Sequence, residues 1–464
     1  MYKKGHIHFI GIGGIGMSGI AKILKYQGYT ISGCDTSLNQ KSIQELLTYG
    51  CTIYEGNNTH QCKDTSIDIL VYSSAIDPED EEIKASQARG IPTIPRALML
   101  AEIMRTKYSI AISGAHGKTT TTSLISHIFI DALLDPTVII GGHLKNICTN
   151  AKWGAGEFLV AEADESDRSF LKLLPTHAVV TNIDLEHLET YKDIDDIKAA
   201  FTQFLSNIPF YGKAIVCLED PHIRSLLPAL THVKMIKYGL DNEADFFAQD
   251  IILEKDHSTF TVFRKNHPEP LGVLTIPMPG IHNVLNALAA LSASMEVGIS
   301  FEKCAEALKT FKGIERRFSF QGVFKGAEVI DDYAHHPTEI STTLQVALKK
   351  NPQNLIVVWQ PHRYIRTEKL WDVFIHLFST STIGHLIITD IYAAGEQPIN
   401  SITSARFTQE LQAKSPSYPI TYIPYEKNFT EIVTHLTTLA SEGDLILLLG
   451  AGNINKIADF LKEQ

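Results

Sequence analysis

A short glycine-rich segment after residue 113 constrains the fold of this chain more than any other feature. An apolar run at 108–112 precedes the segment GAHGKTT at 114–120, and an apolar-periodic run at 124–129 follows it. A buried strand, a glycine turn and a helix that starts with Lys-Thr form a phosphate cradle, because the turn directs backbone N–H groups at an anion. The sequence therefore predicts an α/β domain that binds a nucleotide phosphate here.

Two side chains of this segment have distinct expected roles. Lys118 would bring a positive charge to the β- and γ-phosphates, and Thr119 would offer its hydroxyl to Mg²⁺. The loop is shorter than the usual P-loop, since Ile112 stands where that loop has its first glycine. An ordinary glycine turn followed by a surface lysine is the alternative interpretation of this segment taken alone.

A second glycine turn lies near the start of the chain. We expect a strand at 6–10, then Gly11, Gly13 and Gly16 in Gly-x-Gly-x-x-Gly spacing, a helix to about Tyr26, and a strand that ends at Asp35. This matches the dinucleotide-binding fingerprint, in which a pyrophosphate sits on a helix N-terminus. Alone the pattern indicates NAD, although any nucleotide diphosphate satisfies the same physics.

Further polar residues lie at expected strand ends in the first 110 residues. Ser73 and Ser74 lie at the carboxyl end of an expected strand at 67–73, at the edge where doubly wound sheets bind ligands. A tight turn made of small residues is the alternative. Arg96 begins a helix that leads toward the phosphate loop.

Three successive strands of the second domain end in residues suited to a metal-bound phosphate. Lys118 and Thr119 follow the first strand, Glu162 opens an acidic run after a strand at 158–161, and His187 follows a strand at 177–182. The carboxyl ends of parallel strands share one edge, so these side chains are expected to converge around Mg²⁺. A solvated acidic loop and a capping histidine are the alternatives.

The remaining chain is expected to hold a small antiparallel part at 246–276 and then a third alternating α/β domain. His282 and Asn283 open a long helix, where they would either read an adenine edge or cap the helix. In the third domain, polar clusters at 331–337, 360–366 and 390–396 each follow an expected strand. The histidines of these clusters are candidates to orient or deprotonate an amine, or are structural residues of a helix-capping turn.

Composition narrows the class of protein. The chain has 464 residues, a formal net charge of -11 and six cysteines with no metal-ligand spacing. This balance argues against nucleic acid as a partner. We expect no membrane insertion, because no apolar run reaches the length needed to span a bilayer, and the start shows no secretory signal pattern. The scattered cysteines are expected to be reduced thiols, so a cytoplasmic enzyme is the simplest class.

These motifs, in this order, resemble those of the Mur ligases of bacterial cell-wall synthesis. The resemblance spans nearly the whole chain and rests on residues 11–19, 114–120, 162–167, 181–182 with His187, 282–286, 316–318, 332–337, 360–363 and 392–396. One departure is Ala115, where the family usually has Thr. Since that position offers backbone donors, little effect is expected.

The resemblance implies an α/β fold of three domains. Residues 1–106 would form a Rossmann-like domain for a UDP-sugar, 107–315 a central P-loop ATPase with a mostly parallel sheet and a small antiparallel one, and 316–464 a Rossmann-like domain that binds the amino acid. The resemblance also implies ATP and Mg²⁺ as cofactors and UDP-N-acetylmuramate and L-alanine as substrates. The lactyl carboxylate would form an acyl phosphate that the alanine amine attacks, in a monomer or weak homodimer.

The resemblance assigns the candidate residues to five groups. Those for catalysis are Lys118, Glu162, His187, His336, Arg363 and Arg366. Those for ATP are Gly114, Ala115, His116, Gly117, Lys118, Thr119, Thr120, His282, Asn283 and Arg317. Those for the UDP-sugar are Gly13, Gly14, Ile15, Gly16, Met17, Asp35, Ser73, Ser74 and Arg96. Those for the amino acid are Tyr333, His335, His362 and Tyr392. Those for the metal are Thr119, Glu162 and His187.

Three alternatives remain open from the sequence. A ligase of the same family that adds a preformed peptide to the same UDP-sugar is the nearest one. An NAD-dependent oxidoreductase would explain the first 35 residues but not Lys118, Thr119 and Glu162. A nucleotide-binding switch would use the phosphate loop without the histidine and arginine clusters of the third domain.

Overall fold

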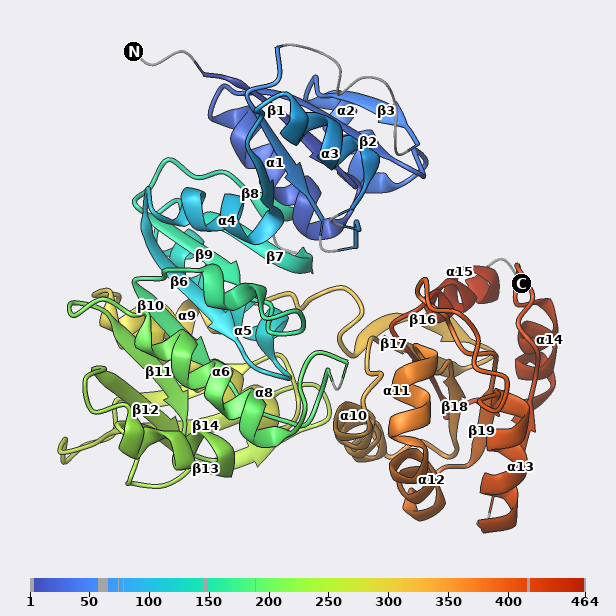
Figure 1. Cartoon of the computed structure of the whole chain (residues 1–464). Helices are drawn as coiled ribbons and strands as arrows, with labels where there is room; N and C mark the ends of the chain where they lie inside the picture. The colour runs from blue at the N-terminus through green and yellow to red at the C-terminus, as the bar shows by residue number, and fades with distance from the viewer. Residues whose placement is uncertain are drawn as a thin grey trace. The chain divides into compact units, whose positions relative to one another are not determined.

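The computed structural model describes residues 4–56, 66–73, 75–77, 79–144, 149–187, 189–414 and 418–462 (Figure 1). The chain divides into two compact units, of which the first comprises residues 1–252 and 258–312 and the second comprises 253–257 and 313–464. Within the described ranges, the strands form sheets of five, ten and six strands. In the same ranges, no helix combines the length and the apolar character needed to cross a membrane.

The five-stranded sheet is parallel and has the order β3-β2-β1-β4-β5. Its strands are β1 (His6–Ile10), β2 (Thr30–Asp35), β3 (Thr52–Glu55), β4 (Ile69–Tyr72) and β5 (Thr93–Pro95). The helices of this part are α1 (Ile15–Tyr26), α2 (Lys41–Thr48), α3 (Glu81–Ala88) and α4 (Arg96–Met104). The chain order reverses between β1 and β4, and such a switch point opens a ligand crevice at the carboxyl ends of the strands.

The ten-stranded sheet has the order β15-β14-β13-β12-β11-β10-β6-β9-β7-β8. Its strands are β6 (Tyr108–Ser113), β7 (Thr137–Leu144), β8 (Thr149–Lys152), β9 (Phe158–Glu162), β10 (His177–Val180), β11 (Lys213–Cys217), β12 (Met235–Gly239), β13 (Phe246–Leu253), β14 (Ser258–Arg264) and β15 (Gly272–Ile276). Its helices are α5 (Lys118–Asp131), α6 (Ile194–Ser206), α7 (Pro221–Leu226), α8 (Ile281–Glu296) and α9 (Phe301–Lys309).

Most neighbours in this sheet run parallel, from β7 through β9, β6, β10 and β11 to β13. The pairs β14–β15 and β7–β8 are antiparallel. The expected antiparallel part is confirmed, but β13 pairs with β12, so it extends the main sheet rather than forming a separate one. The interior strand β10 and its neighbours read as continuous apolar runs, because a central parallel strand is buried on both faces.

The second unit contains the six-stranded sheet, of order β16-β17-β21-β18-β19-β20. Its strands are β16 (Ser319–Phe324), β17 (Ala327–Asp332), β18 (Leu355–Trp359), β19 (His385–Ile388), β20 (Ile420–Tyr422) and β21 (Leu445–Leu449). Its helices are α10 (Pro337–Lys349), α11 (Tyr364–Lys369), α12 (Trp371–Thr380), α13 (Ser404–Lys414), α14 (Thr430–Leu439) and α15 (Ile457–Lys462).

Alternate side chains of these strands feed two separate cores. Val357 and Leu447 belong to the core that includes α10, α12 and α13, whereas Val358 and Leu448 belong to the core that includes α14 and α15. This follows from the two-residue period of a strand, which directs successive side chains to opposite faces. Both faces of the sheet are therefore covered by helices, as Figure 1 shows.

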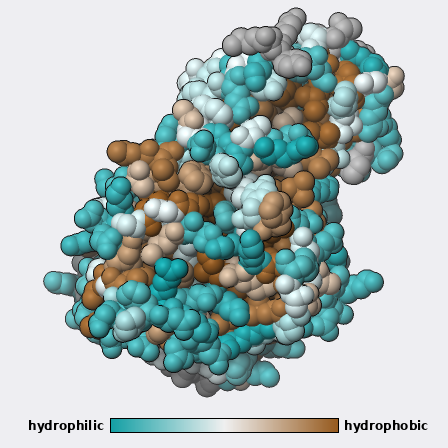
Figure 2. Space-filling model, turned by 90° about the vertical axis from the view of Figure 1, so that its left-hand side faces the viewer, coloured by the Kyte–Doolittle hydropathy of each residue, from teal (hydrophilic) through white to brown (hydrophobic). Residues whose placement is uncertain are grey.

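Several element boundaries differ from the sequence prediction. The sequence predicts a strand at 137–140, but β7 continues through Gly141 to Leu144, because it pairs with β8 beyond Ile140. The sequence predicts one helix at 368–378, where the structure has two helices, α11 and α12, that meet at Leu370. In the view of Figure 2, hydrophilic residues cover most of the face, and hydrophobic residues show between them in several separate patches.

Candidate functional site

The phosphate loop needs its two glycines. Gly114 has φ +135° and Gly117, which precedes α5, has φ +82°. A Cβ atom at Gly114 would lie 2.2 Å from Thr181 Oγ1, and one at Gly117 would lie 2.6 Å from Asn286 Oδ1. Both the backbone conformation and the close neighbours therefore exclude a side chain at these positions.

The two residues that directly follow β10 hold the phosphate loop in place by hydrogen bonds. Asn182 accepts a hydrogen bond from the N–H of His116 (2.8 Å) through Oδ1, and its Nδ2 donates to the carbonyl of His116 (2.9 Å). Thr181 Oγ1 donates to the same carbonyl (2.6 Å), and the N–H of Ala115 donates to the carbonyl of Asn182 (3.2 Å). The amides left for an anion are those of the first turn of α5, which have no partner inside a helix. The predicted residues Lys118, Thr119 and Thr120 form this turn.

Lys118 folds back over its own loop. Its Nζ donates to Glu165 Oε1 (2.7 Å), to the carbonyl of Gly114 (2.6 Å) and to that of Ala115 (3.1 Å). Burial alone would lower the pKa of Lys118, but Glu165, Asp164 and Glu186 raise it above its ordinary value. The ammonium group is therefore charged and available to a phosphate that displaces these partners.

Glu165, Glu186 and His187 form a compact group beside Lys118, with ligand atoms within 4.8 Å of one another. His187 Nε2 lies 3.4 Å from Glu165 Oε1 and 3.6 Å from Glu186 Oε2. Glu165 Oε2 is buried and accepts no hydrogen bond from the described residues. Burial would lower the pKa of His187, but the nearby carboxylates of Glu165, Glu189 and Glu186 raise it to about 9. A buried acidic group of this kind fits a divalent cation.

The sequence prediction named Glu162 rather than Glu165 and Glu186. Glu162 ends β9, and its Oε2 packs so closely on Gly141 that a Cβ there would lie 2.4 Å away. It does not belong to the group of three around His187 found among the described residues. Its role as a ligand, with Thr119, stays a prediction. The acidic run at 162–167 indicated the region of the site. The conformation of this segment determines which of its carboxylates contacts Lys118.

Residues near the start of α8 contact α5, the helix that follows the phosphate loop. Asn286 Oδ1 accepts from Thr121 Oγ1 (3.2 Å), and Asn286 Nδ2 donates to Asn283 Oδ1 (3.4 Å). Asn283 Nδ2 in turn donates to the carbonyl of Pro279 (2.8 Å). Asn283 therefore supports the start of the helix, while His282 beside it is half-buried. Sequence reasoning missed Asn286, which lies one helical turn after Asn283.

The first glycine turn is held by Asp35. Its Oδ2 accepts from the N–H of Gly13 (2.8 Å), and its Oδ1 accepts from the N–H of Ser37 and from Gln40 Nε2 (3.1 Å each). The acidic residue of the fingerprint thus fastens the turn. Gly14 precedes α1, Ile15 is exposed and Met17 is buried. Direct contact of these residues with a UDP-sugar stays a prediction.

Arg96 lies next to this turn. A Cβ at Gly16 would meet Arg96 Nη1 at 2.6 Å, and Arg96 Nη2 lies 3.7 Å from Asp164 Oδ2. Arg96 therefore connects the first glycine turn to the acidic run that contains Glu165. Ser73 Oγ accepts from the N–H of Ala75 (3.3 Å), as a tight turn requires, and Ser74 lies outside the described residues.

In the second unit, the four predicted amino-acid residues form one row of rings. Tyr333 contacts His335 (5.4 Å between centroids), His335 contacts His362 (5.6 Å), and His362 stacks on Tyr392 (5.6 Å). Arg366 Nη1 lies 3.2 Å from His362 Nδ1. Burial, together with Arg366, lowers the pKa of both His335 and His362 to about 3. Both imidazoles are therefore neutral near pH 7 and are poor proton acceptors.

The other predicted residues of this unit have separate partners. Arg363 Nε donates to Glu396 Oε1 (2.6 Å), and Arg317 lies over the Tyr333 ring at 5.4 Å. His336 is buried, precedes α10, and its N–H donates to Glu339 (3.3 Å), which matches the helix-capping alternative.

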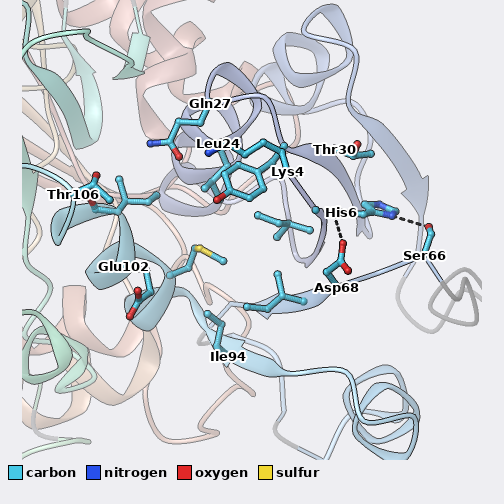
Figure 3. Close-up of a pocket in the computed structure, with 16 residues that line it drawn as sticks. Lys4, His6, Leu24, Gln27, Thr30, Ser66, Asp68, Ile94, Glu102 and Thr106 are labelled. Carbon is cyan, nitrogen blue, oxygen red and sulfur yellow. Dashed lines mark hydrogen bonds between the residues drawn. The ribbon is translucent and has the colours of Figure 1, made fainter. Parts of the chain in front are cut away.

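A cavity of about 870 Å³ lies in the first unit, at the edge of the five-stranded sheet opposite the first glycine turn (Figure 3). It is lined by the amino ends of β1, β2 and β4 and by one side of α4. In Figure 3 the backbone of His6 points to Asp68 and its ring to Ser66. The glycine turn follows the carboxyl end of β1, so this cavity is not part of the nucleotide sites.

The fold and these sites define a three-domain α/β enzyme with a phosphate loop and a second glycine turn near the start of the chain. Family models match three consecutive parts: the Mur ligase family catalytic domain at 6–108, the Mur ligase middle domain at 112–294 and the glutamate ligase domain of the Mur ligases at 316–452. The chain belongs to the Mur ligase family.

Several members of this family are similar to the chain over nearly its whole length. The chain is 46% identical to a UDP-N-acetylmuramate–L-alanine ligase of Syntrophotalea carbinolica, over 98% of this chain and 97% of the relative. Among solved structures, a UDP-N-acetylmuramate–alanine ligase of Thermotoga maritima is 25% identical with a TM-score of 0.80, covering 99% of this chain and 98% of that one. A murein peptide ligase of Psychrobacter arcticus is also 25% identical, with a TM-score of 0.74 and the same coverage.

Proposed function

We propose that this chain joins L-alanine to the lactyl carboxylate of UDP-N-acetylmuramate in peptidoglycan precursor synthesis, while ATP is converted to ADP and phosphate. The observation that carries the proposal is the phosphate loop with charged Lys118 and the acidic group of Glu165, Glu186 and His187, in a chain 46% identical to a ligase of that name. The lactyl carboxylate attacks the γ-phosphate, an acyl phosphate forms, and the alanine amine displaces phosphate from it.

Phosphoryl transfer requires positioning and charge neutralisation more than covalent catalysis by the protein. Lys118 exchanges Glu165 and its loop carbonyls for phosphate oxygens, and the first-turn amides of α5 hold the phosphate chain. Mg²⁺, when bound, neutralises charge on the β- and γ-phosphates. Thr119, Glu162 and His187 are the proposed ligands, and the buried oxygen of Glu165 without a hydrogen bond fits a cation at this place.

The amino acid is proposed to bind at the ring row of the second unit. Arg366 offers a planar guanidinium to a carboxylate, and the neutral imidazole of His362 accepts hydrogen bonds. With a pKa of about 3, His335 and His362 hold the amine in place rather than remove its proton.

The division of labour follows the three domains. Residues 1–106 bind the UDP-sugar, with the diphosphate at the glycine turn beside Arg96; residues 107–315 bind ATP; and residues 316–464 bind the amino acid. We propose that the protein works in the cytoplasm as a monomer or weak homodimer.

The second candidate is a ligase that adds a preformed peptide to the same UDP-sugar, since a murein peptide ligase shares the fold with a TM-score of 0.74. Incubation with ATP, Mg²⁺ and UDP-N-acetylmuramate, plus either L-alanine or a tripeptide that begins with L-alanine, separates the two. We expect mass spectrometry to detect the alanyl product and no tripeptide product. A tripeptide product without an alanyl product would support the second candidate.

A further inference from the structure

A buried group of three potential metal ligands lies in the first sheet, apart from the nucleotide sites. His8 is on β1, Cys34 is on β2 and Glu82 is on α3, and they are 1%, 0% and 3% exposed. One ligand atom of each lies within 4.8 Å of the other two. His8 Nε2 is 3.3 Å from Glu82 Oε1, and Cys34 Sγ is 3.3 Å from Glu82 Oε2.

The histidine of this group faces the carboxylate without a hydrogen bond. His8 Nε2 is buried and makes no hydrogen bond within the described ranges, although Glu82 Oε1 is near. The other ring nitrogen, Nδ1, lies 2.7 Å from Ser32 Oγ. When Nδ1 carries the proton and donates it to Ser32, the Nε2 lone pair points at a carboxylate. A cation between the two groups removes that repulsion, and an outer partner on Nδ1 is typical of metal-bound histidine.

We propose that His8, Cys34 and Glu82 bind one Zn²⁺ ion. Nitrogen, sulfur and carboxylate oxygen are the donor set that zinc prefers, at about 2.0–2.3 Å from the ion. Two donors on one tetrahedral ion are then about 3.3–3.6 Å apart, and both measured separations of 3.3 Å match. Glu82 directs one oxygen to His8 and the other to Cys34, so its carboxylate faces the position that an ion bound by the other two ligands would occupy.

The charges of the three proposed ligands also favour Zn²⁺. On coordination the Cys34 thiol loses its proton to solvent, and the thiolate, the Glu82 carboxylate, neutral His8 and Zn²⁺ sum to zero net charge. Without an ion, the group buries a carboxylate next to a thiol, and such a charge is costly in an apolar interior. No oxidation or reduction is involved, since zinc keeps its charge.

The site would act as a structural clamp below the first glycine turn. The carbonyl of Cys34 accepts from the N–H groups of Gly11 (2.9 Å) and Ile12 (3.1 Å), and the next residue, Asp35, holds Gly13. An ion at Cys34 would therefore tie β1, β2 and α3 together beneath that turn. Ser32 also contacts His6 Nε2 (2.7 Å), and His6 lines the cavity in Figure 3.

The test is metal binding by the full-length chain after removal of metal with a chelator. Zn²⁺ is titrated against a competing indicator, and Co²⁺ is used as an optical probe of thiolate ligation. Cys34→Ser removes the sulfur ligand and keeps a hydrogen-bond donor for Glu82. Cys51→Ser is the matched control, because Cys51 is also a buried thiol of this domain but does not belong to the group.

We expect one tight Zn²⁺ equivalent, a cobalt–thiolate charge-transfer band and a higher melting temperature with zinc in wild type and in Cys51→Ser. Cys34→Ser should lose the band and weaken zinc at least about 100-fold, because even an outer partner is worth 10–100-fold. The proposal is overturned if wild type binds no stoichiometric zinc, or if Cys34→Ser keeps the affinity. A folded Cys34→Ser protein, judged by circular dichroism, makes either outcome decisive.

Discussion

Lys118 is already charged and hydrogen-bonded before a nucleotide arrives. Its partners are one buried carboxylate, Glu165, and two loop carbonyls, so a phosphate gains the lysine by replacing groups that lie within 3.1 Å. These partners hold the lysine side chain over the phosphate loop. Loss of the side chain would therefore remove a positive charge without creating a cavity in the hydrophobic core.

Lys118→Ala should therefore abolish turnover and leave the fold intact. We expect kcat to fall by at least about 1000-fold, because electrostatic groups of this kind supply several kcal/mol in the transition state. Phosphate release measures the activity, and circular dichroism measures the fold. Activity near the wild-type level in a folded variant would contradict the role given to this lysine.

Asp331 supplies a test of pH dependence in the second unit. Burial raises the pKa of Asp331 to about 7, despite the nearby Arg316. The folded state thus binds a proton that the unfolded state has released above about pH 4. The stabilisation from this group is complete below pH 4 and is lost as pH rises through about 7.

Asp331→Asn should remove that pH dependence. Between pH 5 and pH 8, the melting temperature of wild type should drop more than that of the variant, by the equivalent of roughly 1–3 kcal/mol. Asp372→Asn, at an exposed position of α12, is the control and should behave as wild type. Identical pH profiles for Asp331→Asn and wild type would refute the assignment.

At the scale of elements, the end of β10 determines the shape of the phosphate loop. Asn182 alone makes three hydrogen bonds to residues 115 and 116, through its side chain and its carbonyl. Two of these bonds come from the side-chain amide, which alanine would remove.

Asn182→Ala should loosen the loop without unfolding the sheet. The two lost bonds are worth about 1 kcal/mol each, so we expect kcat/KM for ATP to fall roughly tenfold or more, mainly through KM. Asn207→Ala, which removes one amide bond to Leu171 at the end of α6, is the control and should leave KM unchanged. Equal kinetics for the two variants would show that the loop holds its shape without Asn182.

Sequence patterns located the elements with strong periodicity and missed weak ones. The buried strands β1, β6 and β10 and the helices α5 and α8 could be predicted, because apolar runs and glycine turns bound them. The short edge strands β3, β5 and β20 have three or four residues each, too few for a pattern to emerge. The sequence at the break between α11 and α12 contains no Pro or Gly from which the break could be predicted.

At the scale of the whole molecule, the order of motifs predicted the fold class and the family better than it predicted single contacts. Lys118 and His187 were predicted because each follows a strand end. Glu165 and Glu186 were not, because several carboxylates compete within each loop and tertiary packing chooses among them. Likewise, no spacing rule connects His8, Cys34 and Glu82, which meet only through sheet pairing and the packing of α3.

The central claim is that ATP cleavage is coupled to both proposed substrates. The most direct measurement is phosphate release from ATP and Mg²⁺ by the full-length chain, with UDP-N-acetylmuramate and L-alanine supplied separately and together. The account predicts multiple-turnover release only when both are present, matched one to one by alanyl product. Steady release that ignores L-alanine, or no release under any combination, would contradict it.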